Sequence, residues 1–352
     1  MAEKRTEEYY EARLKAAQEA KTKLEIYDVD AHLVETDPEI REFMEEPYCH
    51  RQGPLLGTDA WHTGRGRRDR APNSMEERLR VMAEEGVVLS LLFPSRAMDI
   101  GTMPQKDYVR AFCRAYNNYA AKLCTHEPRL RAAAVIGFQD VPSAVDEVNR
   151  AVTKLGLSAV VISSFGLNEH LGSQTYWPIY EEMQRLNVPL MIHCSIQGPI
   201  GDRRSVSRTM QHTFGRPMAT LMDCTALIYG GVPEKFPKLR VAFLENRAAW
   251  VPYWMDVMDA KWEKRRSDAP LLKARPSEYM IGGNFFYAPE PDEQALPYLI
   301  DQLGDDLFVF ASDYPHSGST FSADLLERND ISDQAKKKIM HINGKRLLFG
   351  SN

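Results

Sequence analysis

The chain has 352 residues and a formal net charge of −5, from 44 Lys+Arg against 49 Asp+Glu. Its 43% hydrophobic and 10% aromatic residues are enough for a large buried core, which excludes fibrous and disordered classes. The length fits two ordinary domains or one barrel-sized domain, and the lack of excess positive charge favours a small-molecule partner over nucleic acid.

The N-terminal segment predicts a charged amphipathic helix, because strong helix formers run through residues 2–23 without Gly or Pro. We interpret residues 1–23 as a helical extension and 24–352 as a single barrel domain. The segment lacks the apolar core of a signal peptide, and the apolar run from Val88 to Phe93 is too short to cross a bilayer. Five cysteines without a CxxC pair fit reduced thiols. We therefore expect a cytoplasmic protein without a membrane helix.

Residues 45–74 mix Pro, Gly, aromatic and basic residues without a steady period, which predicts a long inserted loop after the first strand. The basic run at 64–70 is interpreted as a solvated charged surface, with an anionic substrate or a partner subunit as the alternative. Loops at the end of a barrel set its specificity, so we expect Trp61 and His62 of this loop to line the substrate site. Arg96, after the second strand, is a third candidate and could clamp a carboxylate, with a solvated side chain or an inter-subunit pair as the alternative.

Eight short apolar runs alternate with helical stretches along the chain, as expected for parallel strands that are buried on both faces. The predicted strands are 26–30, 87–93, 132–137, 158–163, 189–193, 240–245, 281–286 and 307–311. The predicted helices are 75–86, 105–126, 142–155, 174–187, 217–230, 247–263, 291–303 and 320–341. Eight such units predict an α/β fold of the (β/α)8 TIM-barrel type. A doubly wound open sheet is the alternative, because periodicity alone does not show that the last strand closes on the first.

Polar residues gather where several of these predicted strands end, which in a barrel is the rim that carries the active site. Asp30 and His32 are two residues apart in the first strand and therefore share a face. His193 ends the fifth strand, and Asp313 follows the eighth. Two imidazoles and two carboxylates on one rim predict a divalent metal site. Asp28 is interpreted as a residue that orients its neighbours rather than as a ligand.

The sequence resembles the amidohydrolase superfamily, and within it the branch typified by aminocarboxymuconate semialdehyde decarboxylase. The resemblance covers most of residues 24–350. It is carried by IYDVDAHLVE at 26–35, YWPIYEEMQRLNVPLMIHC at 176–194, GGVPEKFPKLRVAFLENRAAWVPYWMDVMD at 230–259, FASDYPH at 310–316 and HINGKRLLFG at 341–350. It implies a single divalent metal held by Asp30, His32, His193 and Asp313, and a small carboxylate as the substrate. Members of this branch are often dimers, so we expect a homodimer or a higher homo-oligomer.

Two positions depart from the pattern of this branch. The first strand carries Asp30-x-His32 where the namesake has His-x-His, which favours harder metals such as manganese without excluding zinc. The sixth strand ends in Glu245 where the family often has a histidine. Glu245 is interpreted as a base, as a substrate-holding group or as a partner of Arg247. His212 is a candidate replacement for the missing imidazole, with a surface or structural role as the alternative.

The resemblance favours a metal-dependent decarboxylase of a small aromatic or conjugated enol carboxylate, in which Asp313 delivers a proton to carbon. His316 would orient Asp313, contact the substrate or serve the fold. The same ligands would also serve a hydrolase of an ester, lactone, amide or C–C bond, with Asp313 as the base for an activated water. A barrel that binds metal or ligand without turnover is a third possibility, which the unusual Asp30 and Glu245 keep open.

Overall fold

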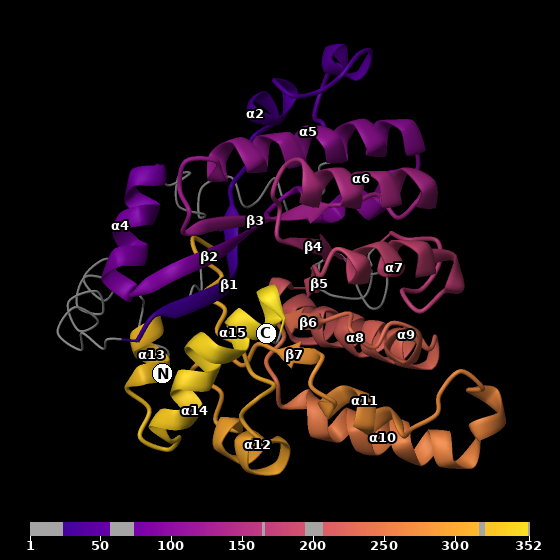
Figure 1. The fold of residues 1–352 in the computed structure, drawn as a ribbon, viewed down its shortest axis with the longest axis vertical. Helices are drawn as coiled ribbons and strands as arrows, with labels where there is room; N and C mark the ends of the chain where they lie inside the picture. The colour runs from indigo at the N-terminus through magenta and orange to yellow at the C-terminus, as the bar shows by residue number, and fades with distance from the viewer. Residues whose placement is uncertain (1–23, 57–73, 164–165, 194–206, 317–320, 351–352) are drawn as a thin grey trace.

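The structure is a computed structural model, which describes residues 24–56, 74–163, 166–193, 207–316 and 321–350. In these residues seven parallel strands form one sheet whose spatial order follows the chain order (Figure 1). The strands are β1 (Ile26–Leu33), β2 (Val87–Pro94), β3 (Leu130–Val135), β4 (Ala159–Ile162), β5 (Leu190–His193), β6 (Val241–Leu244) and β7 (Phe285–Tyr287). A doubly wound sheet reverses its strand order part of the way along, so this order is that of a barrel.

The predicted eighth strand closes the ring as an extended segment, 307–314, that pairs through isolated bridges instead of a regular ladder. On one side, the backbone N–H of Tyr287 donates to the carbonyl of Leu307, and that of Val309 donates to the carbonyl of Tyr287. On the other side, Val29 donates to the carbonyl of Phe310 at 3.0 Å, and His32 donates to that of Tyr314. The segment therefore lies between β7 and β1, which confirms the predicted TIM barrel and excludes the open sheet.

The helices surround the strands, as Figure 1 shows. Those of eight or more residues are α4 (Met75–Glu85), α5 (Lys106–Cys124), α6 (Val141–Thr153), α7 (Trp177–Arg185), α8 (Arg208–Tyr229), α10 (Trp250–Lys264) and α12 (Leu296–Leu303). The shorter ones are α2 (Asp37–Arg41), α9 (Val232–Lys235), α11 (Pro276–Ile281), α13 (Ser322–Leu326), α14 (Asp333–Lys337) and α15 (Asn343–Phe349). Short 3-10 turns lie at Tyr48–His50, Ala97–Thr102, Gln174–Tyr176 and Arg266–Asp268, and one π-helical turn lies at Lys338–Ile342.

Local sequence accounts for these boundaries. The side chain of Ser74 accepts a hydrogen bond from the backbone of Glu77 and so caps the start of α4. Gly86 ends α4 with a φ of 75°, in the left-handed region that glycine enters without strain. The helix predicted over 320–341 is wrong in extent, because it breaks after Leu326 and restarts at Asp333. Ser332 caps the restarted helix by accepting from Ala335.

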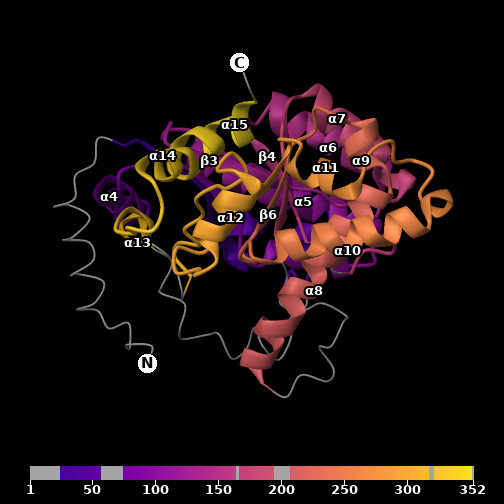
Figure 2. The same ribbon diagram turned by 90° about the horizontal axis from the view of Figure 1, so that it is seen from below.

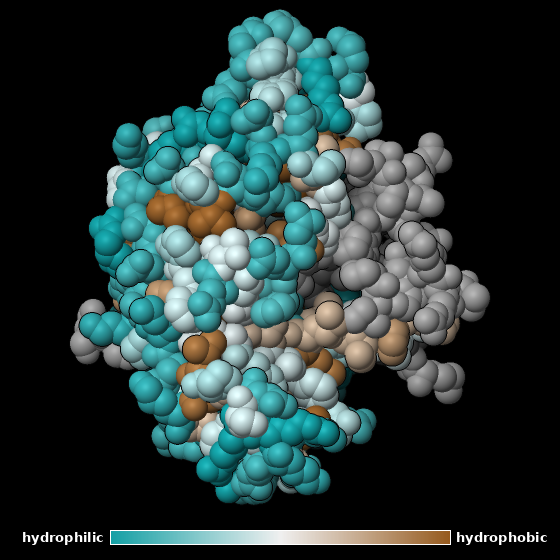
Figure 3. Space-filling view, turned by 90° about the vertical axis from the view of Figure 1, so that its right-hand side faces the viewer, coloured by the Kyte–Doolittle hydropathy of each residue, from teal (hydrophilic) through white to brown (hydrophobic). Residues whose placement is uncertain are grey.

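The strands are almost completely buried, so the main core fills the barrel and the space between barrel and helices. Trp250, Trp254 and Trp262 of α10 pack against this core, as their spacing of four and eight residues predicts. The face shown in Figure 3 is mostly hydrophilic with small apolar patches. Of the helices that the structure describes, none combines the length and the apolarity needed to cross a membrane. The predicted helix over 1–23 and the basic run at 64–70 lie outside the described residues.

Candidate metal centre

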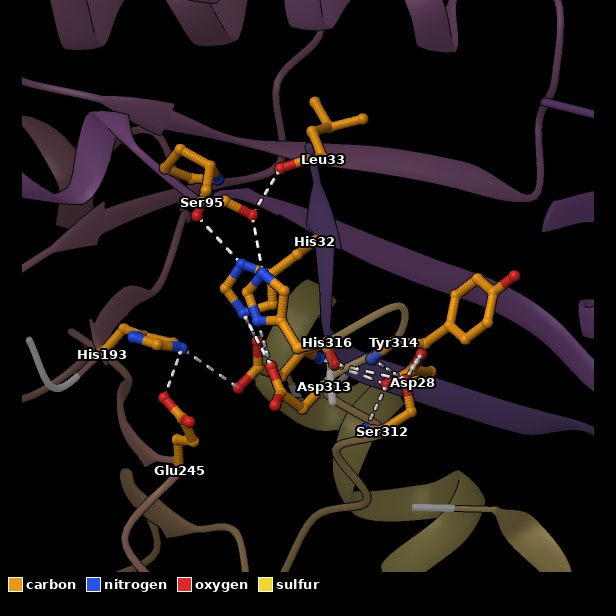
Figure 4. A network of polar contacts seen from close by, with 12 residues as sticks. Asp28, His32, Leu33, Ser95, His193, Glu245, Ser312, Asp313, Tyr314 and His316 are labelled. Carbon is orange, nitrogen blue, oxygen red and sulfur yellow. Dashed lines mark hydrogen bonds and ion pairs between the residues drawn. The ribbon is translucent and has the colours of Figure 1, made fainter. Parts of the chain in front are cut away.

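The carboxyl ends of four barrel segments bring chemically active side chains to one rim, and Figure 4 shows His193, Glu245 and Asp313 among them. Asp30 and His32 come from β1, and His193 is the last residue of β5. Glu245 follows β6 directly, and Asp313 lies in the closing segment. Because all these strands are parallel, their carboxyl ends meet on the same side of the barrel, as the sequence predicts.

The ring nitrogens and carboxylate oxygens at this rim converge. His32 Nε2 lies 3.3 Å from Asp30 Oδ1 and 3.2 Å from Asp313 Oδ1. His193 Nε2 lies 3.8 Å from Asp30 Oδ2. Ligand atoms that share a divalent ion at about 2.1 Å lie roughly 3.0–3.4 Å from one another, so this spacing is that of a metal-binding set. Asp30, His32 and His193 are all buried.

The hydrogen bonding of His32 shows that this cluster fits a cation. Its Nδ1 lies 2.9 Å from the carbonyl oxygen of Pro94, which only accepts, so Nδ1 carries the hydrogen. In the neutral ring the lone pair on Nε2 therefore faces the carboxylates of Asp30 and Asp313. Within the described part of the chain, neither oxygen of Asp30 accepts a hydrogen bond. A cation between these atoms would remove the repulsion and satisfy all of them.

The ionisation of the cluster is strongly perturbed. Burial raises the pKa of Asp30 to about 7, although His32 opposes the shift. Burial also holds the pKa of His193 well below its usual range, and the charge of His32 adds to the effect. Burial would lower the pKa of His32 as well, but Asp30 and Asp313 outweigh it and hold the pKa well above its usual range. Metal binding would favour ionised carboxylates and neutral imidazoles here.

Asp28 lies beneath the cluster and holds the strands that carry it. Its Oδ1 accepts from the backbone of Ser312 at 3.0 Å and from that of Asp30 at 3.3 Å. Its Oδ2 accepts from the hydroxyl of Ser312 at 2.7 Å and from that of Ser90 at 3.3 Å. The carboxylate thus joins β1 to β2 and to the closing segment, and it fixes the residue that precedes Asp313.

Strained backbone marks the same rim. Glu245, Arg247 and Asp313 have φ values of 55°, 57° and 56°, in the left-handed region that residues with a Cβ rarely adopt. Such residues persist where the surroundings hold them in place, and they concentrate at functional sites. Hydrogen bonds hold Asp313 here, since its N–H donates to the carbonyl of Asp30 at 2.8 Å.

His316 connects Asp313 to β2. The imidazole Nδ1 lies 2.8 Å from Asp313 Oδ1, and Nε2 lies 2.8 Å from Ser95 Oγ. The Ser95 hydroxyl donates to the carbonyl of Leu33 at 2.7 Å, so Nε2 of His316 must donate to the Ser95 oxygen. The ring also stacks on His32, with centroids 4.1 Å apart. Burial would raise the pKa of Asp313, but the neighbouring imidazoles of His316 and His32 outweigh it and hold the pKa below its usual range.

On the opposite side of the cluster, Glu245 bridges His193 and α8. Its Oε2 lies 3.3 Å from His193 Nε2, and its Oε1 pairs with the guanidinium of Arg216. Burial raises the pKa of Glu245, and Arg216 opposes the shift. Arg247, which one interpretation of the sequence pairs with Glu245, binds Asp292 at 2.7 Å in this structure. His212 lies one turn before Arg216 on α8 and is partly exposed.

Of the predicted substrate-binding residues, the structure describes only Arg96. The guanidinium of Arg96 pairs with Asp37 at 2.5 Å, so the carboxylate that it binds in this structure belongs to the chain itself. Its backbone N–H, together with those of Ser95 and Ala97, donates to buried Glu35. Trp61 and His62 lie outside the described residues.

Three residues near this site are absent from the predictions made above: Ser95, Arg216 and Glu290. Ser95 and Glu290 follow β2 and β7, so applying the strand-end rule to every strand would have found them. Arg216 comes from the middle of a helix, where no local signal marks it.

The chain is similar to proteins of known family. A family model described as "Amidohydrolase" matches residues 27–350. The chain is 25% identical over 296 residues to a gamma-resorcylate decarboxylase from Polaromonas sp. (strain JS666 / ATCC BAA-500), which covers 80% of this chain and 89% of that protein. It is 24% identical over 236 residues to 2-amino-3-carboxymuconate-6-semialdehyde decarboxylase from Dictyostelium discoideum, which covers 66% of this chain and 65% of that protein.

A solved structure shares the fold. The dihydroxybenzoic acid decarboxylase from Polaromonas sp. JS666, with bound manganese and the inhibitor 2-nitroresorcinol, superposes with a TM-score of 0.72 at 21% identity. The match covers 92% of this chain and 97% of that one.

Proposed function

The chain belongs to the amidohydrolase family, and we propose that it is a metal-dependent decarboxylase of a small aromatic or conjugated enol carboxylate. The observation that carries this proposal is the buried set of Asp30, His32 and His193, whose donor atoms lie within 4.8 Å of one another. The decarboxylase activity of the relatives supports the reaction. The manganese in the dihydroxybenzoic acid decarboxylase supports the cofactor.

Asp30, His32, His193 and Asp313 would hold the ion. Oxygen and imidazole donors in this mixture suit manganese and also accept zinc. A bound divalent ion would supply positive charge that holds the substrate carboxylate and a neighbouring hydroxyl or enol oxygen and favours electron flow away from the scissile bond. The surrounding residues supply position, because Asp28 fixes β1 against the closing segment and the carbonyl of Pro94 fixes the ring of His32.

Asp313 and His316 are the source of the proton. Since Nε2 of His316 donates to Ser95, the 2.8 Å contact between its Nδ1 and Asp313 contains one further proton, shared by these two groups. When carbon dioxide leaves, the electron pair of the broken bond stays on the substrate carbon. That carbon takes the shared proton, and bulk solvent restores it to the pair.

Metal analysis of the purified protein beside His193→Ala tests this assignment, with Glu181→Gln, an exposed change on α7, as the control. We expect near-stoichiometric manganese or zinc in the parent and the control and its loss in His193→Ala. The metal-loaded protein should then release carbon dioxide from gamma-resorcylate or a related hydroxylated carboxylate. Absence of metal after reconstitution would refute the proposal. A product that has gained water would indicate a hydrolase, and bound metal without turnover on such carboxylates would indicate a binding protein.

We also propose a cytoplasmic homo-oligomer. The thiols of Cys49, Cys113, Cys124 and Cys224 are free, as expected in a reducing compartment. Helix α8 extends away from the body of the molecule (Figure 2) and exposes Met210, Phe214 and Met222. Apolar side chains on a projecting helix are typical of a subunit contact. Light scattering of the parent and of Phe214→Asp tests this, with a monomer in both as the refuting result.

A further inference from the structure

The start of the loop after β2 holds two of the imidazoles at the rim. The carbonyl oxygen of Pro94 lies 2.9 Å from Nδ1 of His32, and the hydroxyl oxygen of Ser95 lies 2.8 Å from Nε2 of His316. The regular pairing of β1 with β2 ends at Leu33 and Pro94, one residue before Ser95. Contacts other than the strand ladder must therefore fix the position of Ser95.

Glu35, a residue that the mechanism above does not use, supplies these contacts. It lies two residues beyond the end of β1 and is 3% exposed. Its Oε2 accepts from the backbone N–H of Ser95 at 2.9 Å. Its Oε1 accepts from the backbone N–H groups of Arg96 and Ala97, at 2.7 Å and 2.8 Å. One side chain thus satisfies three consecutive backbone donors, and hydrogen bonds to a carboxylate are stronger than those between neutral groups.

The end of β1 also directs the hydroxyl of Ser95. This hydroxyl donates to the carbonyl of Leu33 at 2.7 Å, which leaves its oxygen to accept from His316 (Figure 4). Backbone and side chain of Ser95 are therefore both fixed to one short segment, residues 33–35. His316 in turn lies 2.8 Å from Asp313 Oδ1 through its Nδ1. A displacement of Ser95 would reach Asp313 through a single imidazole ring.

We propose that Glu35 is a positioning residue for proton delivery, which holds Ser95 where its oxygen accepts from His316, so that His316 presents the shared proton to Asp313. This rests on the proposed function, since it takes His316 and Asp313 to be the source of the proton. The three hydrogen bonds of Glu35 named above all go to the loop after β2. Its effect on turnover therefore passes through Ser95 rather than through contact with the substrate.

A double-mutant cycle between Glu35 and Ser95 tests this route. Glu35→Gln keeps an oxygen for the N–H groups of Arg96 and Ala97, but its amide places a donor against the N–H of Ser95. For release of carbon dioxide from gamma-resorcylate, kcat should fall about 10-fold with the metal content unchanged. In the Ser95→Ala background the hydroxyl is already missing, so the same change should alter kcat by less than about 2-fold.

Glu293→Gln is the matched control for the loss of a buried carboxylate. Glu293 is also 3% exposed, but it lies in the loop after β7 and accepts from the backbone of Ala248 at 3.0 Å and of Ala249 at 2.7 Å. Whatever its own effect on kcat, this effect should multiply with that of Ser95→Ala, because the two residues share no partner. Glu35→Asp keeps both acceptor oxygens on a side chain that is one methylene shorter. It should recover part of kcat, and it replaces Glu35→Gln in the cycle if thermal unfolding shows that Glu35→Gln is not folded.

NMR of the histidine ring nitrogens in the metal-free protein gives a readout that does not depend on turnover. The Nε2–H signal of His316, assigned by its loss in His316→Gln, should be that of a hydrogen-bonded group. It should shift in Ser95→Ala and in Glu35→Gln alike, and it should stay unchanged in Glu293→Gln.

The two readouts distinguish failure of this inference from failure of the proposed function. If the parent releases carbon dioxide but the effects of Glu35→Gln and Ser95→Ala multiply, or if the His316 signal ignores Glu35→Gln, the inference is wrong and the proposed function stands. If the metal-loaded parent releases no carbon dioxide, the proposed function fails, and a role of Glu35 in turnover fails with it. A His316 signal that still responds to Glu35→Gln would then show that the contact exists and that the assigned reaction is the error.

Discussion

Replacing Asp28 with asparagine tests whether this buried residue acts as a hydrogen-bonding clamp rather than as a charged ligand. Asparagine keeps the shape of the side chain. Its carbonyl oxygen can accept from the backbone of Ser312 and Asp30, where Asp28 Oδ1 accepts now. Its amide can donate to the hydroxyl oxygens of Ser90 and Ser312, and the Ser312 hydroxyl then turns to the carbonyl of Asp30, 3.4 Å away. We therefore expect Asp28→Asn to fold.

The magnitude follows from the ionisation of Asp28. Burial raises its pKa to about 6 in the folded protein, against about 3.9 in the unfolded chain. A raised acid pKa means that the folded state binds the proton more tightly, so the stability from protonation is present below about pH 4 and is lost as the pH rises through about 6. The total loss is about 3 kcal/mol, of which about 2 kcal/mol falls between pH 4.5 and pH 8. Asparagine does not ionise and avoids this loss.

Urea unfolding of the metal-free protein measures the effect, with the same substitution at exposed Asp256 of α10 as the control. From about pH 4.5 to about pH 8, the free energy of unfolding of Asp28→Asn should gain about 2 kcal/mol relative to the parent. Asp256→Asn should show no such gain. A variant that is destabilised equally at both pH values would refute the reasoning, since the carboxylate itself would then be needed, for example beside buried Arg78.

Three other perturbations have defined outcomes. Ser95→Ala removes the oxygen to which His316 donates, so kcat should fall by about 10-fold or more with metal content unchanged; steady-state kinetics and metal analysis check this, and loss of the metal would contradict it. Arg216→Met removes the cation that lowers the pKa of Glu245, so the acidic limb of the pH–rate profile should move to higher pH. If this limb does not move, ionised Glu245 is not needed for turnover. Manganese added to metal-free protein should raise Tm more at about pH 8 than at about pH 5.5. Burial raises the pKa of Asp30 to about 7, and its carboxyl must lose the proton to bind the metal. Calorimetry measures Tm, and an equal shift at both pH values would contradict the expectation.

The fold was predictable from the sequence where hydrophobic burial alone decides it. Strands such as β4 and β6 are buried along their whole length, so their apolar runs mark them. Helix α12 begins at Leu296, five residues later than predicted, because residues 288–293 form the loop that Glu293 holds by long-range hydrogen bonds. The closing segment lies where the sequence predicts the eighth strand, but it pairs irregularly. In this irregular part, Asp28 accepts hydrogen bonds from both the backbone and the hydroxyl of Ser312.

The candidate site was predictable to the extent that its groups lie on strands. Asp30, His32 and His193 follow from alternation and strand ends, since strand direction fixes where these side chains meet. The Arg216–Glu245 pair depends on how α8 lies over the rim, which no local pattern specifies. The sequence leaves open whether Arg96 binds a substrate carboxylate; in this structure its guanidinium pairs with Asp37, which only the folded chain brings beside it.

The carboxylate of Glu293 makes two loops dependent on each other in their sequence changes. It belongs to the loop after β7 yet satisfies backbone amides of the loop after β6, so neither loop can change its length or path without leaving buried donors unpaired. Related sequences are therefore expected to vary these two segments in concert. A laboratory transplant that alters substrate choice should move residues 245–249 and 288–293 together as one cassette.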